Sequence, residues 1–368
     1  MLAKILQRRY TVEIIGPEFG DGIWFPLSSD NTILYKPVKM MYSADFIKNI
    51  PRLIKLIKGD ILYVSKPLFT SFNISLFRKI FHNRAVILDI DDWEVGYYEQ
   101  YNNKRLALRN RLGLFKHHLS DFINHPNSYW LAIASEKLIG LADNITVSNT
   151  FLKSKFGGTI IWHARDTTDF DPEKFNKKRL RFDCGLPEKE SIVIFLGTPH
   201  KHKGIEDLIT SLVLLSKHLL VIVGLEDNGY SQRIVDLGKE KLGKRLYCFP
   251  KQPFNKIPEF LAMSDIVVIP QQDTYFSQFQ VPAKVFDAMA MGKPIIATKV
   301  GDLPEILNGC GWLIDPGNIE QLMQTIVFVL NHPIEATIVG QKARRKCIEK
   351  YSWDAVEKTL VNIFKRYE

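Results

Sequence analysis

Short apolar runs alternate with amphipathic segments along the whole chain, which predicts parallel strands joined by helices. In the amino-terminal half, strands are expected at residues 11–17, 60–65, 85–91, 144–148 and 159–164. Helices are expected at residues 1–9, 42–58 with a kink at Pro51, 67–83, 128–142 and 150–156. Between the third strand and Asn127 the chain predicts a long irregular or helical insertion.

The alternation stops at residues 165–190, which are polar and show no apolar period, and it then restarts. Strands are expected at residues 191–196, 219–223, 245–249, 265–270 and 295–298. Helices are expected at residues 203–217, 230–242, 257–263, 319–330, 334–350 and 353–367, with Asn318 and Ser352 as N-caps. Continuous apolar strands are typical of sheets covered on both faces, so we predict two doubly wound α/β domains facing across a cleft.

The length of 368 residues is too great for one ordinary core and fits two domains. We predict an amino-terminal domain at 1–165, a linker at 166–190, a carboxyl-terminal domain at 191–350, and a last helix at 351–368 that packs back on the first domain.

Composition favours a globular cytoplasmic protein, with 46% hydrophobic and 24% charged residues. Four cysteines are far apart and show no zinc-ligand spacing, which indicates reduced thiols. Neither a signal peptide nor a membrane-spanning run is visible.

The formal net charge of +9 is compatible with nucleic acid, an anionic membrane surface or a phosphorylated substrate. Basic residues gather at 48–58 and again at 104–118, where leucines lie between them. The second stretch is either a helix on the inner membrane surface or a plain amphipathic surface helix. No nucleic-acid-binding module is recognisable, so we expect no nucleic-acid partner.

The stretch from Gln278 to Thr298 reads as loop, helix, turn and buried strand. Pro282 suits the first turn of a helix, and Gly292 followed by Pro294 ends it. Free amides at the helix start favour a phosphate. Lys284 and Asp287 share one face, where they either meet phosphate and ribose or form a solvated ion pair.

A second corner, Gly197 to Gly204, closes the first strand of the second domain. Lys201, Lys203 and two histidines, His200 and His202, would gather there around an anion. A basic surface turn is the open alternative. The glycine spacing matches neither the dinucleotide fingerprint nor the P-loop.

Three carboxylates lie in or directly after the strand at 85–91: Asp89 inside it, and Asp91 and Asp92 at its carboxyl end, with Trp93 after them. They either chelate a divalent metal or line the ligand crevice at the carboxyl edge of the sheet. His163, with Arg165 and Asp166, either lines the cleft or caps the linker.

These elements, with the motifs Gly197 to Gly204, Asp265 to Pro270, Pro282 to Pro294 and Gly311 to Pro316, resemble the retaining glycosyltransferases of family four, which have the GT-B fold. The resemblance covers nearly the whole chain. It implies that the second domain binds a nucleotide-sugar and the first binds the acceptor. It also implies that Lys203 neutralises the diphosphate and Asp287 holds the ribose.

The chain departs from the family pattern in several places. Thr198 replaces an arginine, so His200 or Lys201 is expected to take its place. The first of two paired glutamates has no acidic counterpart near Phe279, which leaves its role to neighbouring hydroxyl, amide or backbone groups. The family histidine of the acceptor domain falls at Asp91. The opening strand and glycine-rich loop are missing, which indicates a misplaced gene start or an incomplete fragment.

From the resemblance we expect sugar transfer, with retention, from a nucleoside diphosphate sugar to an acceptor hydroxyl in envelope polysaccharide or glycolipid assembly. No metal is expected to be required, and a lipid-linked acceptor and peripheral membrane contact are expected. Catalytic residues would be Asp91, Lys203 and Asp287; donor-binding residues would be Thr198, His200, Lys201, Lys203, Gln280, Val281, Ala283, Lys284 and Asp287; acceptor-side residues would be Asp91, Asp92 and Trp93. A nucleotide-sugar epimerase and a catalytically silent nucleotide-sugar-binding scaffold are the alternatives.

Overall fold

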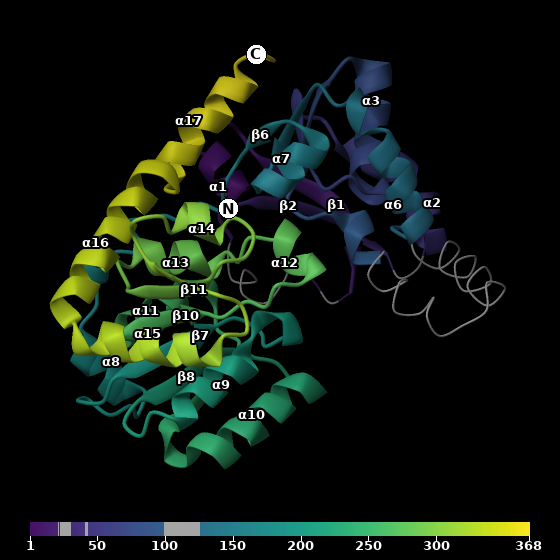
Figure 1. Ribbon diagram of the computed structural model, residues 1–368. Coiled ribbons are helices and arrows are strands. Elements are labelled where there is room, and N and C mark those ends of the chain that lie inside the picture. The colour runs from purple at the N-terminus through teal and green to yellow at the C-terminus, as the bar shows by residue number, and fades with distance from the viewer. Residues whose placement is uncertain (21, 23–30, 41–42, 99–125) are drawn as a thin grey trace. The chain divides into compact units, whose positions relative to one another are not determined.

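The computed structural model describes residues 1–20, 22, 31–40, 43–98 and 126–368. It divides the chain into two compact units (Figure 1). The first unit holds the described residues up to Trp162 together with Glu357–Glu368, and the second holds His163–Val356. The basic stretch at 104–118 and most of the insertion before Asn127 lie outside the described residues.

The first unit contains two parallel sheets. The larger has the order β3 (Ile61–Ser65), β4 (Ala85–Ile90), β5 (Asn144–Val147) and β6 (Thr159–Ile160). The smaller pairs β1 (Glu13–Phe19) with β2 (Leu34–Met40). Its helices are α1 (Leu2–Leu6), α2 (Ser43–Leu56), α3 (Ile74–His82), α6 (Tyr129–Lys137) and α7 (Thr150–Phe156).

The chain returns to the first unit through α17 (Trp353–Phe364). Phe364 packs against the rings of Tyr10 and Tyr63, with centroids 5.2 and 5.7 Å away. Glu357 forms ion pairs with Arg8 at 2.9 Å and Arg9 at 2.7 Å. Both ends of the chain are therefore held in one unit.

The second unit is built on one six-stranded parallel sheet of order β12-β11-β10-β7-β8-β9. The strands are β7 (Ile192–Leu196), β8 (Leu219–Leu225), β9 (Leu246–Pro250), β10 (Ile266–Ile269), β11 (Ile295–Thr298) and β12 (Trp312–Ile314). The strand order reverses between β7 and β10. In open parallel sheets, the crevice at the carboxyl ends of two such strands is where ligands bind.

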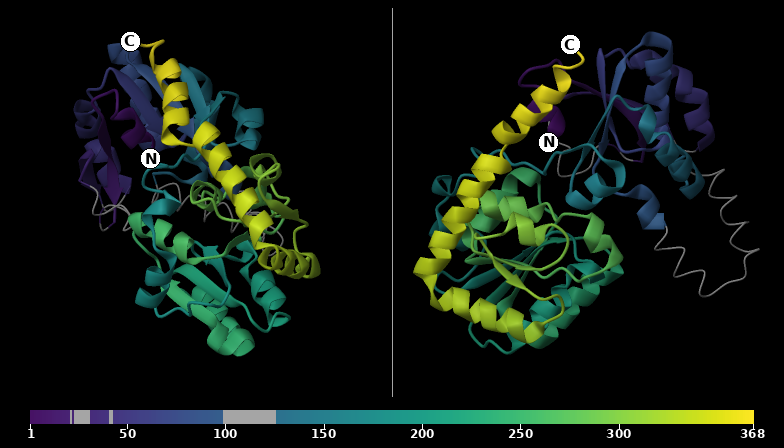
Figure 2. Two further views of the ribbon diagram at one scale, coloured as in Figure 1. Left: turned by 90° about the vertical axis from the view of Figure 1, so that its left-hand side faces the viewer. Right: turned by 45° about the horizontal axis from the view of Figure 1, so that its top comes forward.

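Helices cover both faces of this sheet (Figure 2). One group is α9 (Ile205–Val213), α10 (Gly229–Leu242) and α15 (Ile319–Asn331), which share a core of fully buried side chains that includes Leu208, Ile234 and Leu322. A second group is α11 (Ile257–Met263), α13 (Lys284–Ala290) and α16 (Pro333–Lys350). Two shorter helices are α12 (Tyr275–Phe279) and α14 (Leu303–Ile306).

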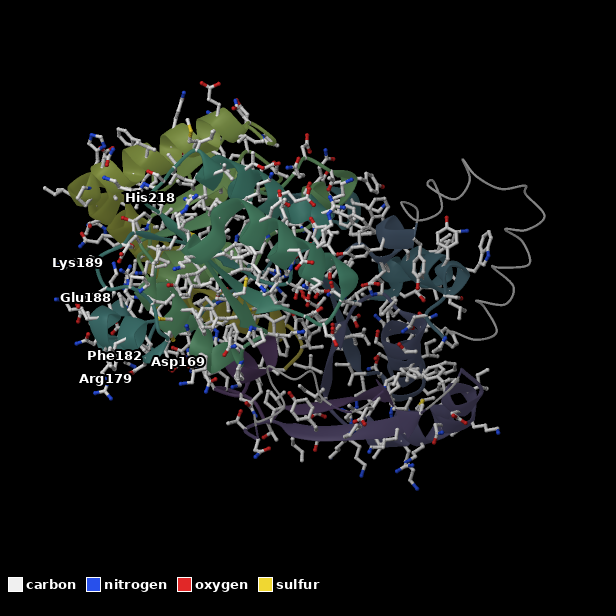
Figure 3. All side chains as sticks on the ribbon, turned by 90° about the horizontal axis from the view of Figure 1, so that it is seen from below. Asp169, Arg179, Phe182, Glu188, Lys189 and His218 are labelled. Carbon is white, nitrogen blue, oxygen red and sulfur yellow. The ribbon has the colours of Figure 1, made fainter. Side chains whose placement is uncertain are left out.

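A helix that the apolar pattern did not predict, α8 (Lys177–Asp183), lies within the segment expected as a linker. Its inward residue is an arginine: the Arg181 side chain is 3% exposed, while Phe182 next to it is 83% exposed (Figure 3). Because the buried side chain of this helix is charged, the helix shows no hydrophobic periodicity from which it could be predicted.

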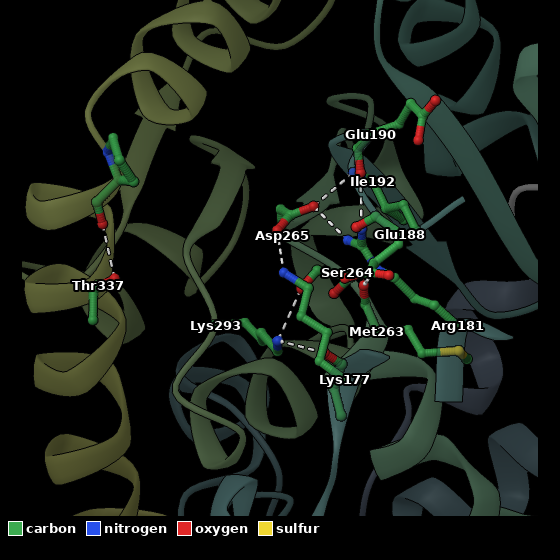
Figure 4. A network of polar contacts seen from close by, with 12 residues as sticks. Lys177, Arg181, Glu188, Glu190, Ile192, Met263, Ser264, Asp265, Lys293 and Thr337 are labelled. Carbon is green, nitrogen blue, oxygen red and sulfur yellow. Dashed lines mark hydrogen bonds and ion pairs between the residues drawn. The ribbon is translucent and has the colours of Figure 1, made fainter. Parts of the chain in front are cut away.

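Arg181 is the centre of a polar network at the amino ends of the strands (Figure 4). Its guanidinium donates to the carbonyls of Met263, Glu188 and Glu190 at 2.8–2.9 Å and to Asp265 Oδ2 at 2.7 Å. The ammonium of Lys177 also pairs with Asp265. Although burial raises the pKa of Asp265, these cations and the Ile192 amide lower it below its ordinary value. These contacts join the segments that lead into β7 and β10.

The predicted α/β class with parallel sheets is confirmed, and the predicted elements agree closely with those observed. Several observed elements were not predicted, among them β2, α8, α14 and β12. The strand predicted at 159–164 pairs only over Thr159–Ile160. The helix α12 was not predicted, although Thr274 and Ser277 cap it reciprocally. Among the described residues no single helix is long and apolar enough to cross a membrane, and one bent pair, α15 with α16, passes by length and composition only.

Candidate functional site

Two loops meet at the switch point of the second unit. Gly204, at the end of the loop after β7, has φ +66°, and a β-carbon there would clash with the carbonyl oxygen of Pro270 at the end of β10. The Gln272 amide donates to the His202 carbonyl at 2.8 Å. Only glycine permits this close approach, because it tolerates positive φ and carries no side chain.

The ammonium groups of Lys203 and Lys284 converge beside Gly197, the residue directly after β7. A β-carbon placed on Gly197 would lie 3.8 Å from Lys284 Nζ and 4.0 Å from Lys203 Nζ, so both ammonium groups lie close to this glycine. Lys203 Nζ donates to the Thr198 carbonyl at 2.8 Å. The two cations come from sequence positions 81 residues apart, as their numbers show, and they share one corner of the sheet.

Both ammonium groups are held at an electrostatic cost. Burial lowers the pKa of Lys203 to about 8. Burial also lowers the pKa of Lys284 well below its ordinary value, and the neighbouring charge of Lys203 lowers it further. Within the described part of the chain, Lys284 Nζ has no hydrogen-bond acceptor and lies over the Phe195 ring at 4.1 Å from the centroid. An anion placed between the two groups would remove this cost.

The histidines of the loop stack on each other rather than pointing at a common ligand. The rings of His200 and His202 are 5.5 Å apart and nearly parallel at 8°. Burial, followed by the charge of Lys203, lowers the pKa of His202 to about 4 and lowers that of His200 as well. Both imidazoles are therefore neutral near pH 7. They can hydrogen-bond to an anion, but they add no positive charge to the site. Lys201 is exposed.

Thr198 belongs to a polar chain on the other side of the corner. Its hydroxyl donates to Glu226 Oε1 at 3.1 Å, and Lys251 Nζ forms an ion pair with the same oxygen at 2.9 Å. The hydrogen bond from Lys251 holds the pKa of Glu226 below its ordinary value. A carboxylate therefore stands near the position where the family pattern has an arginine.

Asp287 does not form the predicted surface ion pair with Lys284, and that alternative is wrong. Asp287 is buried, with 6% exposure, and its Oδ1 accepts a hydrogen bond from Nε of the equally buried Arg165. The second arm of that guanidinium donates to the Ala283 carbonyl at 2.9 Å. Arg165 thereby holds the start and the middle of α13.

Arg165 is also fixed through its own backbone. Its amide donates to the Tyr351 carbonyl at 2.9 Å, and its carbonyl accepts from the Trp353 amide at 3.0 Å. It therefore ties α13 to the junction of α16 and α17. The sequence placed Arg165 at a domain boundary but gave no signal for a partner 122 residues away.

The other donor-side residues border the same helix. Gln280 and Ala283 are half-buried, and Val281 is 5% exposed. They lie between α12 and α13. This segment has no charged side chain, so it can offer a ligand mainly its backbone groups. Residues at the end of β9 and just beyond it make contacts within the second unit: the Phe249 ring lies 5.0 Å from that of Phe260, and the Gln252 side chain donates to the Pro250 carbonyl.

In the first unit, the predicted acceptor-side carboxylates surround a lysine. Lys66 Nζ lies 3.7 Å from Asp91, 3.1 Å from Asp92 and 2.6 Å from Glu94. Burial disfavours the Lys66 cation, but the three carboxylates outweigh it and raise the pKa of Lys66. Trp93 is 8% exposed and donates to Glu136 at 3.0 Å, so its side chain is part of the packing between helices.

Metal chelation by Asp89, Asp91 and Asp92 finds no support. Asp89 is buried and accepts hydrogen bonds from Tyr63 at 3.0 Å and Thr146 at 2.5 Å, and burial raises its pKa to about 6. The position that a metal would need beside Asp91 is taken by the Lys66 ammonium. Over the described ranges, no group of three or more histidine, cysteine or acidic residues could hold a metal ion.

His163 and Asp166 lie on the segment that flanks Arg165. The His163 ring lies 6.4 Å from that of Phe286, while Asp166 accepts from the amide and hydroxyl of Thr168 at 3.0 and 2.6 Å. Asp166 therefore caps the turn that follows Arg165.

Comparison with known families gives residues 176–349 a match to the family described as glycosyl transferases group 1. One relative is MMP alpha-(1->4)-mannosyltransferase of Mycolicibacterium hassiacum, 26% identical over 54% of this chain and 50% of that protein. Another is spore coat protein SA of Bacillus subtilis, 26% identical over 62% of this chain and 65% of that protein. The matched part spans about half the length of the curated relatives.

Solved structures extend the similarity to the rest of the fold. The Anabaena protein HepE, crystallised with UDP-glucose, has a TM-score of 0.74 with this chain at 16% identity, covering 99% of this chain and 94% of that one. At this identity the similarity concerns the fold. It confirms the GT-B type of fold, and the family match agrees with the resemblance over residues 176–349, the part of the chain that carries most of its motifs.

Proposed function

We propose, from the premise that residues 176–349 form a group 1 glycosyl transferase domain, that the protein moves a sugar from a nucleoside diphosphate sugar to an acceptor hydroxyl with retention at the anomeric carbon. In this reaction the bond between the anomeric carbon and the diphosphate oxygen breaks. The acceptor oxygen bonds to that carbon, and its proton leaves. The diphosphate departs with the bonding electrons, and this negative charge must be stabilised.

The observation that carries the proposal is the convergence of two ammonium groups beside Gly197, at the switch point of a parallel sheet. Lys203 and Lys284 are desolvated before any ligand arrives, so little reorganisation is needed when the diphosphate charge develops. Among the described residues, Lys284 Nζ forms no ion pair and lies over the Phe195 ring, and the nearby charge of Asp287 only partly offsets its burial, so a phosphate oxygen would be its first direct anionic partner.

Several narrower statements belong to this proposal. The structural neighbour crystallised with UDP-glucose supports a nucleoside diphosphate sugar as the donor class. A relative that takes its name from the spore coat supports a role in cell-envelope assembly. Reaction without a metal, an acceptor held by the first unit near Asp91 and Asp92, and a cytoplasmic location with contact to the membrane face are parts of the same proposal.

The test is a screen of labelled nucleoside diphosphate sugars against extracted envelope glycolipids and polysaccharides, with the full chain as enzyme. We expect label to enter an acceptor fraction with one donor sugar. Conversion of donor to an isomeric nucleotide-sugar without acceptor would indicate an epimerase instead. Donor binding by calorimetry without transfer or hydrolysis would indicate a silent binding protein.

One observation favours the silent binding protein as a second candidate. Asp287, the residue expected to hold the ribose, is paired with Arg165 inside the unit. The segment before α13 carries no acidic residue that could take over from the family glutamate. Transfer therefore depends more heavily on the two lysines than the family pattern implies.

Replacing Asp287 distinguishes a structural from a ribose-binding role. In the Asp287→Asn variant, the buried Arg165 charge loses its carboxylate but keeps a neutral acceptor. We expect unfolding free energy to fall by about 2 kcal/mol, because a buried charged donor is left poorly compensated. Urea denaturation measures this. An unchanged midpoint together with weaker UDP binding would assign Asp287 to the ribose instead.

Binding of UDP should be accompanied by proton uptake above pH 8. Lys203 has its pKa lowered to about 8, so in the free protein it is largely deprotonated at higher pH. A diphosphate beside it favours the charged form and raises this pKa, so a proton is taken up on binding. Calorimetry in two buffers of different ionisation enthalpy gives the proton number. We expect it to decrease in the Lys203→Met variant, and equal heats in both buffers would contradict the site.

A further inference from the structure

Glu226 lies beside the corner of the sheet where the two lysine ammonium groups converge. It directly follows β8, which pairs in parallel with β7 (Figure 1). The ends of the two strands are close together. The Gly197 amide donates to the Val223 carbonyl at 2.8 Å, and a β-carbon on Gly224 would lie only 2.7 Å from the Gly197 carbonyl carbon. The end of β8 therefore brings Glu226 to the edge of the proposed diphosphate site.

The Glu226 carboxylate is oriented by two neighbours and keeps one oxygen available. Its Oε1 accepts hydrogen bonds from the Thr198 hydroxyl at 3.1 Å and from Lys251 Nζ at 2.9 Å. The Thr198 carbonyl accepts from Lys203 Nζ at 2.8 Å, so one residue contacts both the carboxylate and the ammonium. Oε2 accepts no hydrogen bond from the part of the chain that the structure describes, and the Glu226 side chain is 37% exposed.

A nucleoside diphosphate bound at this corner would bring hydroxyl donors with it. Its ribose carries two hydroxyl groups, and each needs an acceptor when it leaves water. An ionised carboxylate is a strong acceptor for them. Asp287, the residue expected in this role, has a side chain that is only 9% exposed, and Arg165 binds its Oδ1. Glu226 is far more accessible, and the hydrogen bond from Lys251 keeps its pKa low, so it is ionised near pH 7.

We propose that Glu226, rather than Asp287, binds the ribose hydroxyls of the nucleoside diphosphate. The inference rests on the proposed function, because it assumes a diphosphate at the two ammonium groups. In dinucleotide-binding sheets, an acidic residue about 20 residues beyond the phosphate-binding turn accepts a hydrogen bond from a ribose hydroxyl. Glu226 follows Gly204 by 22 residues, as their numbers show, and it stands at the end of the neighbouring strand. Its Oε2 would accept from the ribose, so the protein would prefer ribonucleotides to deoxyribonucleotides.

The experiment is calorimetric titration of the full chain with whichever of UDP, GDP and ADP binds most tightly, and with its 2′-deoxy and 3′-deoxy analogues. The three ligands carry the same charge, so their comparison cancels any change in repulsion between the site and the diphosphate. The unaltered protein should bind the ribonucleotide at least about tenfold more tightly than the weaker deoxy analogue, as expected for a hydrogen bond to a charged group. In Glu226→Ala this ratio should fall to about twofold or less, and Glu226→Gln, which keeps a neutral acceptor, should lie between.

Asp227→Ala is the matched control, because it removes an exposed carboxylate from the next residue in the chain. It should keep the preference for ribose. The inference is overturned if the unaltered protein binds all three ligands equally, if Glu226→Ala keeps the preference, or if Asp227→Ala loses it as well. It is equally overturned if the preference is lost in Asp287→Asn and kept in Glu226→Ala. If the unaltered protein binds no nucleoside diphosphate at all, the proposed function fails and this inference fails with it. Far-ultraviolet circular dichroism verifies folding of each variant.

Discussion

Lys203→Ala is expected to lower kcat for sugar transfer by about 100-fold to 1,000-fold, the range found when one preorganised charge-stabilising donor is removed from an active site. The ammonium lies 4.0 Å from where a β-carbon on Gly197 would be, and its hydrogen bond to the Thr198 carbonyl fixes its position. It therefore does not have to be ordered or desolvated when the diphosphate leaves. Lys284 would keep part of the stabilisation, which is why the loss is not complete.

The same substitution should leave the folded state nearly unchanged. Burial already disfavours the charged form of Lys203, as its lowered pKa shows, so removing the charge relieves a cost while deleting one hydrogen bond. Turnover is measured with saturating donor, and stability by urea denaturation. Lys201→Ala is the control, because Lys201 is exposed two residues away on the same turn. Unchanged turnover in Lys203→Ala, or an equal loss in Lys201→Ala, would remove Lys203 from the site.

The meeting of Lys203 and Lys284 was predictable from sequence because it follows from topology. Continuous apolar strands alternating with helices dictate a parallel sheet, and the carboxyl ends of parallel strands share one edge. A cation after β7 and a cation at the start of α13, which lies between β10 and β11 in the chain, are then brought to the same corner. Glycine at 204, needed for the approach of the two loops, was also visible as part of the motif.

Other features depend on pairings that no local pattern encodes. The partner of Asp287 is Arg165, near the start of the second unit on a segment that has no apolar period. Trp93 follows two carboxylates and was expected beside the acceptor, but a glutamate on α6 draws its indole into the packing. In both cases a polar side chain is satisfied by a distant residue, and such a contact is decided by the packed structure rather than by the spacing.

The helix α8 is the clearest example, and it leads to the largest effect expected on stability. Arg181 donates to the backbone carbonyls of Met263, Glu188 and Glu190, at the longer distance of 3.4 Å to that of Pro187, and to the Asp265 carboxylate (Figure 4). In Arg181→Ala, those carbonyls and Asp265 lose their main donor and stay buried. We expect the free energy of unfolding to fall by about 3 to 5 kcal/mol, the range for breaking a buried ion pair by removing one partner.

Arg179→Ala provides the control for this prediction, since Arg179 is two residues away on the same helix and its side chain is 79% exposed. We expect no measurable change there. Arg181→Lys separates charge from geometry: an ammonium can reach Asp265, but it cannot hold three carbonyls in the planar fork of a guanidinium. Most of the loss should therefore remain in Arg181→Lys. Denaturation curves that coincide for Arg181→Ala and Arg179→Ala would mean that water replaces the guanidinium without cost, and that α8 is held by its other contacts.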